Sequence, residues 1–337
     1  MKAIAYQKSL PIHEADALRD ITLPEPVAKG RDLLVEVKAI SVNPVDTKVR
    51  KNAQPAADEW KVLGWDVAGV VHAVGPEATM FKKGDRVWYA GSIIRPGANS
   101  ELHLVDERIV GNMPATLDFA AAAALPLTGI TAWEMLFDRL EIKPGKKVTG
   151  ESLLIIGAGG GVGSIMTQLA RRLTGLTVIG TASRRETKKW VSELGAHHVI
   201  DHSKSLTEEL KRIAIPQPNY IVSLTQTDQH FAHIVEAIAP QGKFGLIDDP
   251  KTLDVTQFKR KSVSVHWESM FTRSMFNTPD MLDQHDLLTE MAALVDAGLL
   301  RTTLGEHFGT INATNLKRAH ALLESGKSRG KIVLEGF

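Results

Sequence analysis

The sequence predicts an α/β protein in which a doubly wound parallel sheet is joined to a mostly β domain. A glycine-rich turn separates the apolar run Leu153–Ile156 from apolar residues that recur at helical spacing after Ser164. Short apolar strands then alternate with helices as far as His266, which is the pattern of a parallel sheet with crossover helices. Residues 1–120 instead contain short alternating strands and many turns, which predicts a mostly antiparallel, barrel-like β domain.

Composition argues against some classes of function and excludes cysteine chemistry. Lys and Arg total 40 against 39 Asp and Glu, so the chain lacks the basic excess of a nucleic-acid or membrane-surface binder. It contains no cysteine, which excludes disulfides, thiolate nucleophiles and thiolate-ligated zinc. The first residues form no signal-peptide core, and no purely apolar run reaches the roughly 20 residues of a membrane span. We therefore expect a soluble cytoplasmic protein.

In the β domain, Leu34–Val42 alternates, and "DVAGVVHAVG" and "GDRVWYAG" predict strands with glycine turns. A helix begins in "TLDFAAAAALPLTGITAWEMLF" and breaks at Pro126. Near the C-terminus, two amphipathic helices are each followed by a glycine, and "GKIVLEGF" returns to a strand. We therefore predict a split catalytic domain, residues 1–124 and 268–337, with a cofactor domain, residues 125–267, inserted.

The glycine turn has the strand–turn–helix context of a dinucleotide site, where helix N–H groups face a pyrophosphate and missing side chains let the ligand approach. Its spacing departs from the usual motif. It is either Ala158-x-Gly160-x-x-Gly163 or Gly157-x-x-Gly160-x-x-Gly163. A purely structural turn is the alternative, and the strand–helix units that follow favour the binding site.

Those units are regular enough to assign. We expect strands at 177–181, 198–201, 220–224, 243–247 and 262–266, and helices at 184–194, 203–214 and 228–239. Gly195 is the expected stop of the first helix, and Ser203 is the expected N-cap of the second.

The end of the second strand indicates which dinucleotide binds. An NAD site has an acidic residue there for the ribose hydroxyls, but this chain has Ser183, Arg184, Arg185 and Lys188. Donors and positive charge suit a 2′-phosphate. A solvated helix N-terminus is the alternative, although the helix dipole disfavours cations there. The sequence thus favours NADP(H).

Several motifs occur together in one order: "SVNPVDTKVR", "LGWDVAGVVHAVG", "GDRVW", "ALPLTGITAW", "GAGGGVG" and "RGKIVLEG". Their order resembles that of the medium-chain dehydrogenases/reductases over essentially the whole chain, and is most similar to the zinc-less quinone oxidoreductases. "SLTQTDQH", "HWESMFTRSM" and "TPDMLDQH" resemble the subgroup labelled zinc-type alcohol dehydrogenase-like. The resemblance implies a GroES-like catalytic domain, an inserted Rossmann domain that binds NADPH, and a homodimer formed through the strand "KSVSVHW".

The resemblance also implies the site residues. Cofactor contacts are expected from Asn43, Thr128, Gly160, Gly161, Val162, Ser183, Arg184, Lys188, His202, Leu224, Ile247, Met270, Phe271 and Lys331. Asn43, Asp46 and Trp65 are the candidates nearest the chemistry: Asn43 to orient or donate, Asp46 chiefly to fix its loop, and Trp65 to form the pocket wall.

The family's zinc ligands are missing. Zinc members have Cys at the position of Asn43 and His at that of Trp65, and only the carboxylate Asp66 remains. A catalytic zinc needs about three protein ligands, so we expect no metal site. His197, His198 and His202 cluster, but turn and surface roles are expected for them.

These expectations indicate NADPH-dependent reduction of quinones or related α,β-unsaturated carbonyls, small electrophiles that accept hydride without a metal. One alternative is an alcohol or aldehyde dehydrogenase with an atypical zinc site. Another is a non-catalytic NADPH-binding protein, either redox-sensing or RNA-associated. The near-neutral charge and the few aromatic residues make nucleic-acid binding the least supported of these hypotheses.

Overall fold

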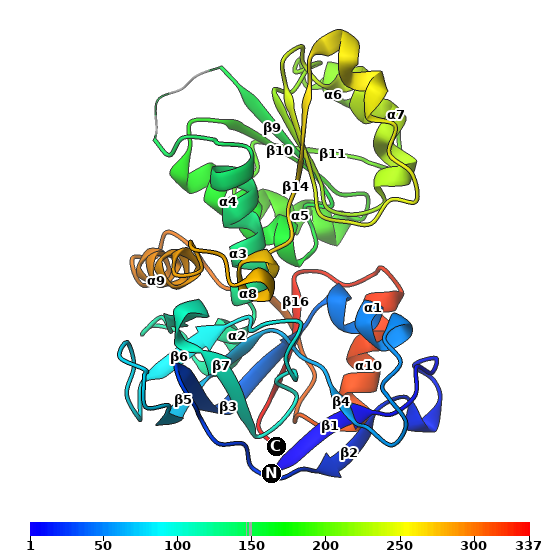
Figure 1. Ribbon diagram of the computed structural model, residues 1–337. Coiled ribbons are helices and arrows are strands. Elements are labelled where there is room, and N and C mark those ends of the chain that lie inside the picture. Colours follow the sequence, from blue (N-terminus) through cyan, green and yellow to red (C-terminus); the bar gives the residue numbers. More distant parts are fainter. Residues whose placement is uncertain (146, 148–149) are drawn as a thin grey trace. The chain divides into compact units, whose positions relative to one another are not determined.

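A computed structural model describes residues 1–145, 147 and 150–337 (Figure 1). The chain divides into two compact units. Unit 1 comprises Met1–Ile130 and Phe271–Phe337, and unit 2 comprises Thr131–Met270. The domain boundaries proposed from the sequence, 124/125 and 267/268, lie slightly before these divisions.

Unit 1 is built on two β-sheets that together use ten strands of the described chain. Their bounds are β1 (Lys2–Tyr6), β2 (Arg19–Thr22), β3 (Asp32–Val42), β4 (Lys61–Val62), β5 (Val67–Val74), β6 (Arg86–Tyr89), β7 (Leu102–Asp106), β8 (Val110–Asn112), β15 (Leu304–His307) and β16 (Lys331–Glu335). The smaller sheet has the order β2-β1-β4, and the larger has β15-β16-β3-β5-β6-β8, with β7 also paired to β3. All of these pairings are antiparallel except β15 with β16.

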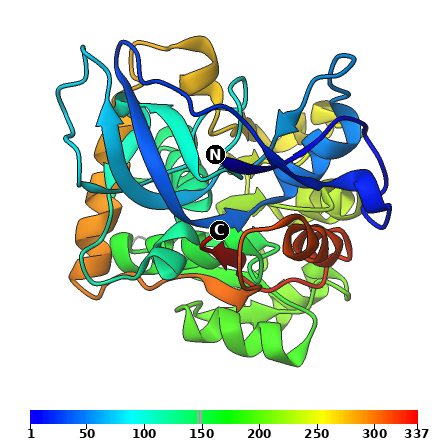
Figure 2. The same cartoon turned by 90° about the horizontal axis from the view of Figure 1, so that it is seen from below.

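The last strand of the chain lies beside the longest strand of unit 1. β16 pairs antiparallel with β3, and Ile332 lies opposite Val42 in the register. Figures 1 and 2 both show the N- and C-termini close together on this unit. This pairing brings the sequence around residue 331 next to the start of the first α-helix, and that proximity builds the polar cluster described below.

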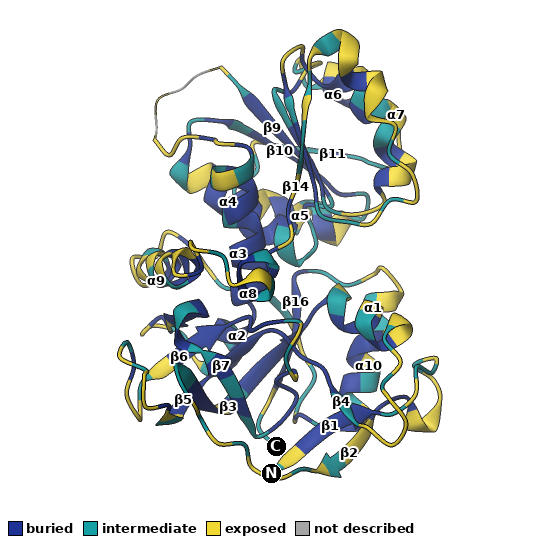
Figure 3. Cartoon of the chain, viewed as in Figure 1, coloured by how far each residue is buried: buried dark blue, intermediate teal, exposed yellow. Residues whose placement is uncertain are grey.

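The helices of unit 1 are α1 (Pro44–Asn52), α2 (Phe119–Ala123), α8 (Thr272–Phe276), α9 (Asp283–Asp296) and α10 (Ala313–Glu324). In the described residues, 3₁₀ helices occupy Ala15–Ala17 and Glu107–Ile109 in unit 1 and Val255–Lys261 in unit 2. α9 and α10 follow the predicted amphipathic pattern, since each buries one face and exposes the other (Figure 3). Gly298 and Gly326 follow them with positive φ, as expected of helix-ending glycines.

Unit 2 contains the predicted doubly wound sheet. Its six parallel strands are β9 (Ser152–Ile156), β10 (Thr177–Thr181), β11 (His198–Ile200), β12 (Tyr220–Ser223), β13 (Lys243–Leu246) and β14 (Ser264–Trp267). Their order is β11-β10-β9-β12-β13-β14. Successive strands are therefore added on one side of β9 as far as β11, and on its other side from β12 onward. The end of β9 is therefore a topological switch point, where open parallel sheets bind ligands.

Both faces of this sheet are covered by helices, which explains the continuous apolar character of β9. The helices are α4 (Gly161–Leu173), α5 (Arg185–Glu193), α6 (Leu206–Arg212) and α7 (Thr227–Ala237). Leu154 and Ile156 join the core cluster that contains Leu206 and Leu210 of α6 and Ile234 of α7. Figure 1 shows α6 and α7 together on one side of the sheet and α4 on the other.

One predicted helix start is wrong. We expected a helix from Ser203 with that serine as its N-cap, but α6 begins at Leu206 and Ser205 is the N-cap. The Asp201 carboxylate accepts hydrogen bonds from the backbone N–H of Ser203 at 3.0 Å and from its hydroxyl at 2.7 Å. This local turn occupies the serine and delays the helix.

The apolar segment that contains Pro126 is helical and breaks where expected, since α2 ends at Ala123 and the next helix begins at Pro126. Phe119–Arg139 combines α2, α3 (Pro126–Trp133) and a π-helical turn (Glu134–Arg139). By length and composition alone this segment is long and apolar enough to cross a membrane, with a mean hydropathy of 1.3. However, 83 % of its most apolar window is buried within the protein, as in the core helix of a soluble protein.

Candidate cofactor and active-site residues

The glycine turn of unit 2 shows which glycines the fold itself requires. Gly157 has a φ of 87°, which favours glycine. A Cβ on Gly163 would lie 2.5 Å from the Ala158 Cα, so the first turn of α4 packs directly against the turn backbone. Both positions are thus explained by conformation and packing alone.

Gly160 is different, because the protein leaves room for a side chain there. A Cβ on Gly160 would meet only the Gly157 carbonyl oxygen, at 3.6 Å, which is an ordinary contact. Gly160 is the N-cap of α4, and Gly161 and Val162 begin its first turn, where backbone N–H groups have no intrahelical acceptor. The helix start thus offers backbone donors, and the fold does not require glycine at position 160. Both features fit a bound pyrophosphate.

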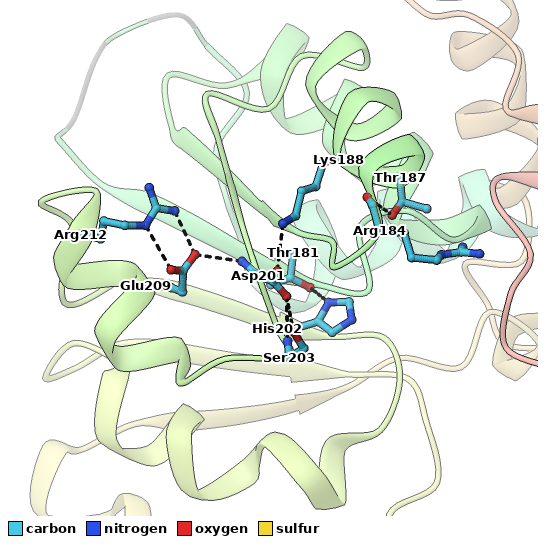
Figure 4. Close-up of polar contacts among 9 residues, drawn as sticks. All are labelled: Thr181, Arg184, Thr187, Lys188, Asp201, His202, Ser203, Glu209 and Arg212. Carbon is cyan, nitrogen blue, oxygen red and sulfur yellow. Dashed lines mark hydrogen bonds and ion pairs between the residues drawn. The ribbon is translucent and has the colours of Figure 1, made fainter.

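The predicted phosphate-binding residues lie around the ends of β10 and β11 (Figure 4). The ammonium of Lys188, on α5, lies 2.9 Å from a carboxylate oxygen of Asp201. Arg184 is the N-cap residue of α5, and Figure 4 shows its side chain extending away from Asp201. Ser183 and Arg184 are half-buried. Lys188 is therefore held in place, while Arg184 extends from the start of the same helix.

A short hydrogen-bond chain links this region to the glycine turn. The backbone N–H of Gly157 donates to the Thr181 hydroxyl oxygen at 3.0 Å, and the His202 Nδ1 lies 3.1 Å from the same oxygen. Burial lowers the pKa of His202, which favours the neutral ring. The structure thus brings the predicted residue His202 to the switch point together with the turn.

Two further predicted residues follow neighbouring strands of the same sheet. The backbone N–H of Leu224, directly after β12, donates to the Ile156 carbonyl, and that of Ile247, directly after β13, donates to the Ser223 carbonyl. Both side chains are half-buried at the carboxyl edge of the sheet. This is the edge at which ligands of open α/β sheets bind.

Unit 1 contains a separate, fully buried polar cluster around Asp66. This carboxylate is 0 % exposed. It accepts hydrogen bonds from the Ser41 hydroxyl at 2.7 Å, the Asn43 amide at 3.1 Å and the Leu127 backbone N–H at 3.1 Å. The Lys331 ammonium lies 3.1 Å away as a fourth donor. A buried carboxylate needs such donors to offset its lost hydration.

Asn43 and Lys331, both predicted cofactor contacts, are held inside this cluster. The Asn43 amide nitrogen donates to Asp66 and, at 3.4 Å, to the Ser41 carbonyl, and its amide oxygen accepts from Lys331. Both amide hydrogens therefore already have acceptors. Lys331 is 3 % exposed and also donates to the Val42 carbonyl at 3.0 Å. Sequence reasoning missed this pairing of Lys331 with Asp66.

Asp46 forms a capping box at the start of α1. Its carboxylate accepts from the Asn43 backbone N–H at 2.7 Å, which satisfies a donor at the helix start. Burial raises the pKa of Asp46 to about 7, despite the opposing effects of that hydrogen bond and of the nearby Lys331 charge. Of the two roles considered for Asp46, this geometry supports fixing the loop.

The aromatic residues of unit 1 also form a defined contact. The Trp65 indole N–H donates to the Ser92 carbonyl at 3.2 Å, and the Trp65 and Phe271 rings meet edge to face at 6.2 Å between centroids. Thr128 is buried, and its hydroxyl donates to the Leu125 carbonyl at 3.2 Å. Met270 is buried as the last residue of unit 2. Trp65 and Phe271 are 1 % and 7 % exposed, so they pack against each other within the protein.

The donor set in the structure does not fit a catalytic zinc. Within the described ranges, no group of three or more His, Asp or Glu side chains could hold a metal ion. Asp66 directs its oxygens at protein donors, and Asn43 and Trp65 supply no thiolate or imidazole. Of the clustered histidines, His197 accepts a hydrogen bond from the Val178 backbone N–H, a structural role.

Comparison with known proteins adds the following. Residues 29–115 match the alcohol dehydrogenase GroES-like domain, and residues 194–334 match the zinc-binding dehydrogenase family. A zinc-type alcohol dehydrogenase-like protein of Staphylococcus aureus is 40 % identical over 337 residues, which cover 99 % of each chain.

Two solved structures extend the comparison. A protein of Rhizobium etli, named as a candidate zinc-dependent alcohol dehydrogenase, is 59 % identical with a TM-score of 0.96, covering 100 % of this chain and 98 % of that one. An Escherichia coli quinone oxidoreductase complexed with NADPH is 26 % identical with a TM-score of 0.85, covering 99 % and 100 %.

Proposed function

We propose that this chain, which belongs to the quinone oxidoreductase-like branch of the medium-chain dehydrogenase/reductase superfamily, uses NADPH to reduce quinones or related α,β-unsaturated carbonyls without a catalytic metal. The single observation that carries the proposal is the glycine turn, where Gly160 has room for a side chain yet has none. A ligand that approaches the backbone explains that glycine, and packing does not.

The choice of NADPH is supported by the charges at the ends of β10 and β11. Arg184 and Lys188 supply positive charge where a 2′-phosphate would lie, and Ser183 adds a hydroxyl. Two acidic groups lie beside them: Asp201 is engaged by Lys188 and Ser203, and Glu186, 56 % exposed, lies 3.4 Å from the Arg184 guanidinium. An E. coli relative of the same fold has been crystallised with NADPH.

Independence from a metal is supported by the surroundings of Asp66. A metal at this carboxylate would have to displace the Lys331 ammonium, the sequence has no cysteine, and the described residues form no group of three possible ligands. NADPH supplies a hydride when it is bound. The chain's own residues would then bind its phosphates at the α4 N-terminus and at Arg184. Trp65, the expected pocket wall, is held in position by Phe271 and by the Ser92 carbonyl.

An assay series tests this function. The purified protein is given NADPH with a panel of quinones and enals, and NADP⁺ with simple alcohols, each with and without added Zn²⁺ and a chelator. We expect NADPH oxidation with quinones or enals that the chelator leaves unchanged. Zinc-dependent alcohol oxidation with no quinone or enal reduction would instead favour the atypical zinc dehydrogenase that the names of two relatives suggest.

Cofactor preference has its own test. Arg184→Ala is expected to weaken NADPH binding by roughly 1–3 kcal/mol, the scale of a charged hydrogen bond, with little change for NADH. Fluorescence titration measures both cofactors. Lys189→Ala, on the same helix with a side chain 78 % exposed, is the control for a general loss of positive charge. Equal affinity of the wild type for NADPH and NADH would remove the phosphate-site assignment.

The proposal includes a cytoplasmic homodimer that acts on a small electrophile. In the described chain β14 pairs only with β13, so its other edge is available to a second copy, and Trp267 on β14 is 53 % exposed. Light scattering tests the dimer. A monomer at micromolar concentration would contradict it.

A further inference from the structure

The ammonium of Lys331 lies in a cage of three oxygen atoms. It donates to the Val42 carbonyl at 3.0 Å, to the Asn43 amide oxygen, and to an Asp66 carboxylate oxygen at 3.1 Å. The side chain is 3 % exposed. Three acceptors of three chemical types thus converge on one buried nitrogen.

The geometry requires the charged form of the lysine. Burial lowers the pKa of Lys331, while the charge of Asp66 and its hydrogen bond raise it. A neutral amine has two N–H bonds and a lone pair, and that lone pair would have to face one of the three oxygens. Only an ammonium can donate to all three.

The oxygen cage is held by contacts that do not involve the lysine. Asp66 is fixed by the Ser41 hydroxyl and the Leu127 backbone N–H, and the Asn43 backbone by the Asp46 carboxylate. Val42 lies at the end of β3 within the sheet. The cage is therefore a preformed set of carbonyl, amide and carboxylate oxygens, which is the ligand type that hard cations prefer in proteins.

We propose that Lys331 is the resident cation of this oxygen-lined site, and that its tethered ammonium balances the Asp66 charge and orients the Asn43 amide oxygen in place of a diffusible ion. Lys331 is then a positioning residue, not a direct ligand of the cofactor. Removal of its side chain should leave a site that accepts a small primary ammonium ion.

Chemical rescue tests the proposal without requiring enzyme activity. Lys331→Ala removes the atoms equivalent to n-propylammonium, which is the probe. We expect the variant to have a lowered Tm that rises in a saturable way with propylammonium chloride, because a ligand of the folded state stabilises it. Wild type should show no such rise.

Three controls isolate the ammonium. Propan-1-ol has the same chain without the charge, and tetramethylammonium has the charge without N–H donors, so neither should rescue the variant. Lys2→Ala is the matched variant in the same unit, since the Lys2 side chain is 66 % exposed, and propylammonium should leave its Tm unchanged. Equal rescue by propan-1-ol would mean that the variant binds any small molecule that fills the cavity, whatever its charge, and would overturn the proposal.

A second pair of variants covers the case in which Lys331→Ala does not fold. Lys331→Met fills the space without charge and leaves Asp66 buried and unpaired. Lys331→Met with Asp66→Asn removes both charges and should have a higher Tm than Lys331→Met alone. Additive losses in the double variant would contradict a direct pairing of the two charges.

The remaining alternative is that Lys331 binds cofactor phosphate directly. Propylammonium would then fail to raise the Tm of Lys331→Ala, and the main defect would be salt-dependent loss of NADPH affinity, which overturns the proposal. A further readout, NADPH turnover restored by propylammonium through kcat, rests on the proposed function. If Tm is rescued but wild type reduces no quinone or enal, the proposed function fails and the cation site stands.

Discussion

Two lysine–aspartate pairs of this protein have nearly the same geometry and opposite surroundings. Lys188 and Asp201 lie 2.9 Å apart in unit 2, with side chains 41 % and 13 % exposed. Lys331 and Asp66 lie 3.1 Å apart in unit 1, with side chains 3 % and 0 % exposed. The distance between charges does not distinguish the pairs, but access to water does.

The difference in exposure gives the two pairs different capacities. Water can solvate Lys188 when it leaves Asp201, so an incoming phosphate can share it at small cost. Burial raises the pKa of Asp201, but hydrogen bonds from Lys188 and Ser203 outweigh it and hold this pKa well below its usual range. Lys331 and Asp66 have no such freedom, because either charge left alone would be buried without a partner. The first pair suits ligand exchange and the second suits a fixed scaffold.

The largest expected effect separates the two carboxylates. Asp66→Asn should lower the free energy of unfolding by roughly 3–5 kcal/mol, since it leaves the Lys331 ammonium buried without a counter-charge. The matched change Asp201→Asn should cost at most about 1 kcal/mol, because Lys188 reaches water. Urea unfolding of both variants measures the contrast. Similar losses in the two would show that exposure does not decide the role of the pair.

A second effect, somewhat smaller, comes from Asp46 beside the buried pair. Because its folded pKa is raised from 3.8 to about 7, the unfolded chain ionises first as the pH rises through this window. Folding stability from Asp46 is therefore fully present below about pH 4 and is lost as the pH approaches 7, by roughly 2–4 kcal/mol.

Asp46→Asn keeps an oxygen for the Asn43 backbone N–H and cannot ionise. Urea midpoints of wild type and variant, measured from pH 4 to pH 8, should therefore diverge in favour of the variant as the pH rises. His103 and His320, whose pKa values burial lowers to about 4 and about 3, titrate in both proteins and cancel in the difference. Parallel curves would mean that Asp46 ionises normally.

The exposed pair should affect binding more than folding. Lys188→Ala should weaken NADPH by about 1–2 kcal/mol in low salt and by less in high salt, with NADH nearly unchanged. Lys189→Ala is the control on the same helix, since its side chain is 78 % exposed and pairs with Glu193. Titrations at two salt concentrations measure both variants, and an equal loss in the control would assign the effect to overall charge.

The smallest expected change in the free energy of unfolding is that of Gly160→Ala in the glycine turn. Gly160→Ala should change the free energy of unfolding by only about 0.5 kcal/mol, yet abolish most NADPH binding, because the added methyl meets only the ligand's space. Gly163→Ala should cost roughly 1–3 kcal/mol of stability, since its Cβ would strike backbone atoms. Undiminished NADPH affinity in Gly160→Ala would remove the main support for the cofactor site.

Local patterns were sufficient to predict most of unit 2. The strands at 177–181 and 243–247 and the helix at 184–194 differ from β10, β13 and α5 by at most a residue or two at each end. Two-sided burial and helical spacing are patterns of residues near one another in the sequence, so they can be recognised before the fold is known. The start of α6 was misjudged because Ser203 bonds to Asp201 instead of capping the helix.

By itself, the sequence determined the doubly wound sheet, the glycine turn and the positive charge at Arg184 and Lys188, all within short stretches of chain. Only the tertiary structure decided that Lys331 lies against Asn43 and Asp66, since β16 must first pair with β3. That pairing joins residues from opposite ends of the chain and buries their charges together. No local periodicity records such a contact, because it depends on which strand edges meet and not on the residues beside each one.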